Sequence, residues 1–339
     1  MDLNRPWRRR VAAIVRGIAA LAITAGSAAA AYAERGTLRT GMTVLWHARP
    51  GWVAAGAALE CLSMAAFVLL QQRLLTAAGA KLAFTSVLAT GYASNAIAAG
   101  VPIVGSGLAA ATVLRRFREH GIEPAAIRLT LGLAGVISTV GFGVIAAAGA
   151  GLTGNPAGAV TGLLAGCGSA AAAALLIIVA HSAGGRARLQ PVAASVLRLA
   201  ARVARHPAGD PSVIAARVIG RVGSLKLSAG SICYLLACSL VNWAADALCL
   251  AAAIGAVGLA IPWSKLLLVW SAGAGASTLS PTPFGLGIVE AALIAALAAA
   301  GISSPHAIGA VLLYRIMTFK IGGLVWAVHV HLRQSRPAA

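Results

Sequence analysis

The sequence predicts an all-α, polytopic integral membrane protein, a helical bundle of about six full spans plus two re-entrant helical hairpins. The first observation is composition: of 339 residues, 59% are hydrophobic and the mean hydropathy is +0.87. Soluble domains are only about 45–50% apolar. The second observation is pattern, because the apolar residues form runs long enough to cross a bilayer, separated by short basic segments.

We expect a single membrane domain over residues 1–339, since no soluble stretch is long enough to fold separately. It divides into a first half (11–181), a basic cytoplasmic loop (182–228) and a second half (229–331). Full spans are predicted near 11–33, 51–70, 124–150, 156–181, 229–255 and 306–331. The first run resembles a signal peptide, but its length favours a retained span over cleavage.

Two further apolar regions, 82–110 and 264–300, are interrupted by Pro and Gly near their middles. A full crossing of 82–110 would place Arg115 and Arg116 outside, whereas a re-entrant hairpin keeps them inside, as the positive-inside rule favours. Either arrangement leaves both termini cytoplasmic. The loop 182–228, with eight basic residues and one acidic residue, lies on the same side.

The two interrupted regions also resemble each other. Gly105 and Gly107 follow Pro102 before an Ala-rich stretch, much as Gly285 and Gly287 follow Pro283. Entering from opposite sides, the two hairpins would be corresponding elements of an inverted repeat with a transport site at the midplane. Chance placement of two Gly/Pro breaks is the alternative.

The formal charge of +19 does not indicate nucleic-acid binding, because the basic residues lie in short segments between apolar runs. Arg198, Arg202 and Arg205 share one face of a helical projection. This pattern is equally compatible with an amphipathic helix on the membrane surface and with a solvated loop.

Five charged residues lie deep in the apolar runs: four at a similar depth, namely Glu60, Asp246, Glu290 and Arg315, and Lys320 about a turn and a half further in. Each costs about 3 kcal/mol to bury in lipid. Glu290 lies thirteen residues before Ser303 and Arg315 lies twelve after it, so the helical rise places both at one depth. An ion pair between them would lower the desolvation cost, and all four charges would share one midplane layer. The alternative is a set of structural pairs that fix helix register.

A broken backbone survives in lipid only where protein or a water-filled cavity satisfies its polar groups. The break before Glu290 therefore predicts a polar site. We expect the four charged residues to line a translocation site together with Asn95, Ser280, Pro281, Thr282, Pro283, Gly285, Gly287 and Tyr314.

No catalytic motif accompanies this site. The sequence has no G-x-S-x-G, H-E-x-x-H or P-loop, and its five cysteines lack metal-ligand spacing. We therefore expect no enzyme activity, no catalytic residues, no metal and no cofactor.

The run Pro281-Thr-Pro283-Phe-Gly285-Leu-Gly287-Ile-Val-Glu290, followed by Leu312-Leu-Tyr314-Arg315, resembles the lysylphosphatidylglycerol synthase transmembrane (flippase-domain) family. That family typically reads P-x-G-x-G-x-x-E and then L-L-Y-R, and the stretch 91–121 is similar to its N-terminal counterpart. The resemblance implies a polytopic protein with re-entrant helices that binds or moves lipids. In two-domain members a soluble domain aminoacylates phosphatidylglycerol and the membrane part flips the product.

This chain ends eight residues after the span 306–331, so we expect a stand-alone membrane part without the synthase domain. The sequence departs from the family pattern at two places. No carboxylate follows Gly107 as Glu290 follows Gly287, and Phe319-Lys320-Ile-Gly replaces an aromatic-apolar run.

These observations favour a flippase or lipid-handling transporter of the cytoplasmic (inner) membrane, in which a headgroup crosses through a midplane polar cavity. The expected partners are an anionic or aminoacylated phospholipid or a polyprenyl-linked lipid, with no nucleic acid. The first alternative is a non-transporting partner that recruits a lipid or glycan biosynthesis enzyme through the loop 182–228. A homo-oligomer or a complex with a membrane enzyme is compatible with either. A membrane-embedded lipid-modifying enzyme is the remaining alternative.

Overall fold

The computed structural model describes residues 43, 47–100, 105–156, 158, 160–164, 167–168, 171, 183–204, 210–224, 228–279, 287–302 and 306–318. Within these ranges every regular element is a helix. The predicted span 11–33, most of 156–181 and the end of 306–331 lie outside the described residues.

Among the described residues, three helices are long and apolar enough to cross a membrane: α3 (Pro50–Ala77), α6 (Pro124–Leu152) and α10 (Ala229–Ala256). Each measures about 42 Å at 1.5 Å per residue, against a hydrocarbon core of about 30 Å. The predicted spans at 51–70, 124–150 and 229–255 are thereby confirmed as apolar helices of spanning length. Proline opens both α3 and α6, where its missing N–H leaves no hydrogen bond unmade.

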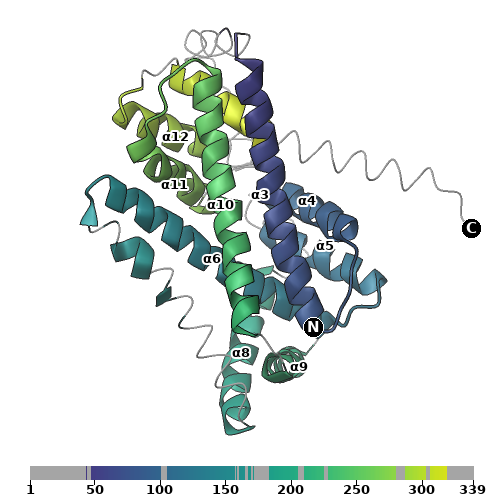
Figure 1. Ribbon diagram of the computed structural model, residues 1–339. Helices are drawn as coiled ribbons and strands as arrows, with labels where there is room; N and C mark the ends of the chain where they lie inside the picture. Colours follow the sequence, from purple (N-terminus) through teal and green to yellow (C-terminus); the bar gives the residue numbers. More distant parts are fainter. Residues whose placement is uncertain are drawn as a thin grey trace, which may run out of the picture.

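The helices α3 and α10 lie side by side and antiparallel at the centre of the molecule (Figure 1). The Arg49 N–H, just before α3, donates to the Ala256 carbonyl at 2.8 Å. Halfway along, the Asn242 amide donates to the Ser63 hydroxyl at 2.8 Å and to the Ser63 carbonyl at 3.0 Å. Each of these two residues is the fourteenth of a 28-residue helix, so the helices meet at their midpoints.

The region predicted as the first re-entrant hairpin forms two helices, α4 (Phe84–Gly100) and α5 (Gly105–Glu119), which pack against each other. The Ser86 hydroxyl lies 3.2 Å from His120 Nε2, so α4 begins beside the end of α5. The helix α5 continues beyond the apolar region 82–110, because the arginines that lower the hydropathy are good helix formers. A re-entrant position in the membrane stays a prediction.

The second interrupted region forms α11 (Trp263–Leu279) and α12 (Ile288–Ala299), also packed together. A Cβ added to Gly273 would lie 2.5 Å from Leu293 Cδ2, so this glycine permits the close approach of the two helices. A further helix, His306–Thr318, follows.

The basic segment 182–228 contains two helices, α8 (Ala183–Ala204) and α9 (Pro211–Ser224). They pack against each other, and α9 contacts α6. The backbone N–H and the hydroxyl of Ser212 both donate to Asp210 Oδ1, at 2.9 and 2.6 Å, and this carboxylate precedes the first turn of α9. The described part of the segment is thus helical, and its position on a membrane surface stays a prediction.

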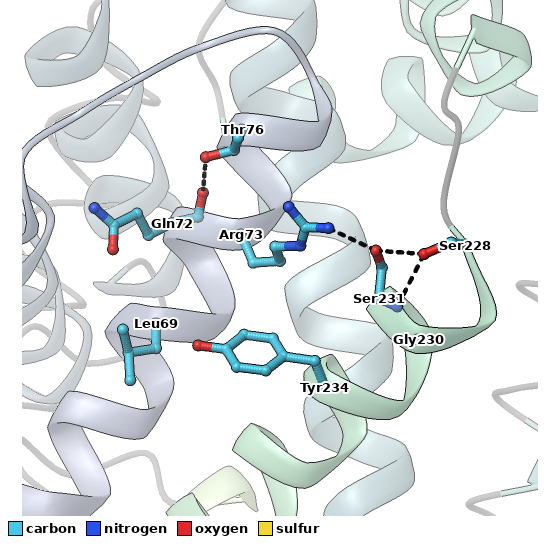
Figure 2. A pocket seen from close by; sticks show the side chains of 8 residues that line it. All are labelled: Leu69, Gln72, Arg73, Thr76, Ser228, Gly230, Ser231 and Tyr234. Carbon is cyan, nitrogen blue, oxygen red and sulfur yellow. Dashed lines mark hydrogen bonds between the residues drawn. The ribbon is translucent and has the colours of Figure 1, made fainter.

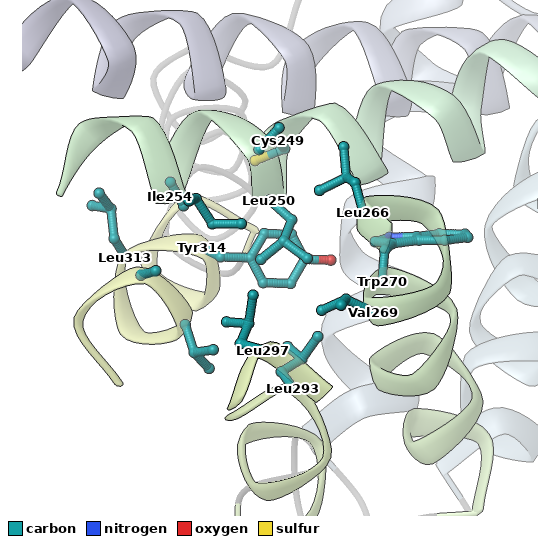
Figure 3. Close-up of a cluster of buried hydrophobic side chains, with 14 of the residues drawn as sticks. Cys249, Leu250, Ile254, Leu266, Val269, Trp270, Leu293, Leu297, Leu313 and Tyr314 are labelled. Atoms are coloured by element: carbon teal, nitrogen blue, oxygen red, sulfur yellow. The ribbon is translucent and has the colours of Figure 1, made fainter. Parts of the chain in front are cut away.

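The largest group of buried apolar side chains lies where α10, α11, α12 and the helix His306–Thr318 meet (Figure 3). Leu250 and Leu297 are fully buried, and Trp270 is 1% exposed. The ring of Tyr314 lies among them, with its hydroxyl pointing toward Trp270. This cluster holds in place the polar side chains described next.

Candidate functional site

An ion pair joins α12 to the helix His306–Thr318. Arg315 Nε donates to Glu290 Oε1 at 2.7 Å, and the two side chains are 13% and 18% exposed. The ion pair expected from their equal depth is therefore present. At this burial and distance the contact is a charge-assisted hydrogen bond.

The turn before α12 positions Glu290. Gly287, the N-cap residue, has φ +85°, a conformation that glycine adopts without strain. Its N–H donates to Glu290 Oε2 at 2.8 Å. A carboxylate at the third helical position that accepts the N-cap N–H forms one half of a capping box. Its negative charge also interacts favourably with the positive end of the helix dipole. Both oxygens of Glu290 are thus engaged, one by the turn and one by Arg315.

Asp246 is the second centre of the site. Its Oδ1 accepts a hydrogen bond from the Tyr314 hydroxyl at 2.8 Å and its Oδ2 accepts one from Trp270 Nε1 at 3.0 Å. The carboxylate also interacts electrostatically with Arg315. Since the three partners come from α11 and the helix His306–Thr318, this one side chain of α10 connects three helices.

Glu60 adds a carboxylate from α3. It is 8% exposed and interacts electrostatically with Asp246. Glu60 lies ten residues after Pro50 and Asp246 lies ten residues before Ala256, so both are about 15 Å from the same end of the α3–α10 pair. In the part of the chain that the structure describes, the Glu60 carboxylate accepts no hydrogen bond. We call Glu60, Asp246, Glu290 and Arg315 the charged layer.

The remaining predicted residues divide into two groups. Asn95 is exposed, and its amide contacts Met64 Sδ at 3.6 Å without a hydrogen bond to the charged layer. The others lie outside the described residues, namely Ser280, Pro281, Thr282, Pro283 and Gly285.

Sequence reasoning missed two polar residues that support the layer. Trp270 donates to Asp246, and Asn242 joins α10 to α3. Asn242 could have been found from the sequence, because it lies one helical turn before Asp246 on the same face. The Trp270 contact could not, because it depends on how α11 packs against α10.

The layer offers carboxylates to a cation and a guanidinium to an anion. Among the described residues no group of three His, Cys, Asp or Glu side chains could hold a metal ion. With carboxylates and a guanidinium together, the layer can bind a charged or zwitterionic group.

Residues 17–325 match the family model described as "Lysylphosphatidylglycerol synthase TM region". The match covers most of the chain, which therefore belongs to this family of multi-pass membrane proteins with a lipid-related function. No curated protein matches the chain.

Proposed function

We propose that this protein is a flippase, which moves a lipid with a charged headgroup across the cytoplasmic membrane while the acyl chains remain in the bilayer. The observation that carries the proposal is the charged layer, because four ionisable side chains gather inside an apolar helical bundle, two of them on the spanning-length helices α3 and α10. Such residues are costly in a bilayer and usually mark a substrate or ion pathway.

The substrate class follows from the chemistry of the layer. Arg315 would face a phosphate, for which a guanidinium offers a matching set of donors. Glu60, whose carboxylate accepts no hydrogen bond within the described residues, would receive an ammonium group. An anionic or aminoacylated phospholipid carries one or both of these groups, and the family's relation to lysylphosphatidylglycerol supports the choice.

The repeated lengths of the helices support a transporter architecture. Both α3 and α10 have 28 residues, and both α4 and α11 have 17. The antiparallel contact of α3 with α10 is what two halves of inverted topology would make. In this proposal the two halves move against each other, so that the charged layer opens alternately toward the two leaflets.

The test is lipid transfer between leaflets by the full chain in phosphatidylglycerol-containing vesicles, using a fluorescent phosphatidylglycerol that an external reductant quenches in the outer leaflet. We expect E290A and R315A each to abolish transfer while membrane insertion is retained. The control R217A removes an exposed arginine of α9 and should transfer lipid normally. Transfer by both layer variants at the unaltered rate would overturn the proposal.

A second candidate is recruitment of a lipid or glycan biosynthesis enzyme, favoured by the packed pair α8–α9 and its exposed Arg188 and Arg198. Deleting 183–224 would then abolish function in cells, whereas E290A and R315A would be silent. We propose transport without catalysis for the chain itself, and formation of a modified lipid by the purified protein would contradict this.

A further inference from the structure

A cavity of about 460 Å³ lies between α3 and α10, away from the charged layer (Figure 2). Its walls come from the last turns of α3 and the first turns of α10. Arg73 lies thirteen residues beyond Glu60 along α3, so the cavity is about 20 Å from the layer. That separation places it near a membrane surface, which is the cytoplasmic surface in the predicted orientation.

The polar wall of this cavity is suited to an anion. Arg73 Nη2 donates to the Ser231 hydroxyl at 2.7 Å, and within the described residues no carboxylate lies at ion-pair distance from the guanidinium. The Arg73 guanidinium has five N–H donors, and the neutral Ser231 hydroxyl accepts a hydrogen bond from one of them. Ser231 is itself 5% exposed and is fixed by Ser228, whose hydroxyl lies 3.0 Å away.

The first turn of α10 adds to the positive potential. Ser228 is the N-cap residue and its side chain accepts the Ser231 N–H at 3.2 Å. The N–H groups of Ala229 and Gly230 precede the first helical hydrogen bonds, so they have no carbonyl partner within α10. A guanidinium beside a helix N-terminus is an arrangement that favours phosphate groups.

The other wall of the cavity is apolar and lies toward the middle of the membrane. Leu69 precedes Arg73 by one turn, and Tyr234 follows Ser231 by about one turn; these side chains are 37% and 43% exposed. In Figure 2 the Tyr234 ring lies beside the Arg73 side chain, with its hydroxyl directed toward Leu69. Tyrosine is enriched at this depth of a bilayer. The polarity of the cavity therefore changes in the same direction as that of a phospholipid, from phosphate to acyl chain.

We propose that this cavity binds the phosphodiester headgroup of an anionic phospholipid, with the phosphate on Arg73 and the first turn of α10, and with the glycerol and acyl region against Leu69 and Tyr234. A free phosphate offers the same anion chemistry but would not use the apolar wall. The site requires only binding, so it does not depend on transport through the charged layer.

The experiment measures lipid selectivity of the full chain in nanodiscs, as the immobilised fraction of spin-labelled phosphatidylglycerol relative to spin-labelled phosphatidylcholine. We expect wild type to prefer phosphatidylglycerol and R73Q to lower its apparent affinity about tenfold, because hydrogen bonds to a charged group are lost. R73K keeps the charge without the planar fork and should retain part of the preference. R217Q, which removes a positive charge outside the cavity, should retain all of it.

Three results would overturn the proposal: an unchanged preference in R73Q, an equal loss in R217Q, or Arg73-dependent binding of inorganic phosphate without any lipid preference. Failure here differs from failure of the proposed function. R73Q can lose lipid selectivity while E290A still blocks transfer, and an inert charged layer leaves the preference in nanodiscs unaltered.

Discussion

Breaking the ion pair between Glu290 and Arg315 should show how strongly these two buried charges depend on each other. R315M leaves Glu290 Oε2 with its hydrogen bond from Gly287 but removes the donor to Oε1. Removing one partner of a buried ion pair lowers the free energy of unfolding by about 3–5 kcal/mol. Because the two side chains keep 13–18% exposure, we expect a value near the lower limit, about 3 kcal/mol. E290Q keeps an acceptor for the Gly287 N–H and should cost about 1–3 kcal/mol.

The double variant E290Q/R315M removes both charges, so neither is left buried without its partner. We expect it to be no less stable than R315M, with a coupling energy of about 2 kcal/mol. The measurement is the free energy of unfolding of the purified chain in mixed micelles for all four members of the cycle. Additivity within about 0.5 kcal/mol would refute the reasoning, because it would mean that the contact contributes nothing beyond its separate side chains.

Three further perturbations have expected outcomes in thermal unfolding. In wild type the Asp246 carboxylate accepts hydrogen bonds from both Trp270 and Tyr314, whereas the amide of D246N has only one acceptor oxygen. One buried donor therefore loses its partner, which should lower the free energy of unfolding by about 1–3 kcal/mol. An unchanged melting temperature would contradict this network. G149A places a Cβ 2.8 Å from Leu267 Cβ and should lower the free energy of unfolding by about 1–3 kcal/mol. The control G151A, on the same helix with open space around the added Cβ, should leave stability unchanged. Equal melting temperatures for the two variants would show that the helices adjust to the added methyl group without cost. G287A forces alanine into φ +85° at the start of α12 and should cost about 1–2 kcal/mol, and an unchanged melting temperature would show that this turn relaxes freely.

The long helices and the central ion pair could be predicted because each depends on local information. The apolar run 124–150 matches α6 to within two residues, and the run 51–70 matches the start of α3 to within one residue, although α3 continues to Ala77. The helical rise alone relates the depths of Glu290 and Arg315 on either side of one turn. No knowledge of packing between distant segments is needed for either inference.

What could not be predicted depends on contacts between distant segments. The Trp270 hydrogen bond to Asp246 requires the rotation of α11 against α10, which hydropathy does not encode. Asn95 illustrates the opposite error, because a polar residue in an apolar run was expected at the site and instead lies exposed on α4. The role of Arg73 in the cavity could not be predicted either, since its partner Ser231 is 158 residues away.

The midpoint contact between Ser63 and Asn242 leads to a final prediction about motion. Glu60 and Asp246 lie three and four residues from this contact on the same side, about 5 Å along the helices. The ends of α3 and α10 lie thirteen or fourteen residues from it, about 20 Å. If the two halves rock about the contact, as inverted-repeat transporters do, the helix ends separate about four times as far as the acids.

Spin labels at Thr76 and Gly230, both exposed at the edge of the Arg73 cavity, would report this motion. In a cysteine-free background with phosphatidylglycerol present, we expect two populated distances for this pair. A second pair at Leu62 and Val241, exposed residues next to the midpoint contact, should give one distance. One distance for both pairs would mean that α3 and α10 move as a rigid unit. The charged layer would then have to open elsewhere, because the α3–α10 crossing would stay closed.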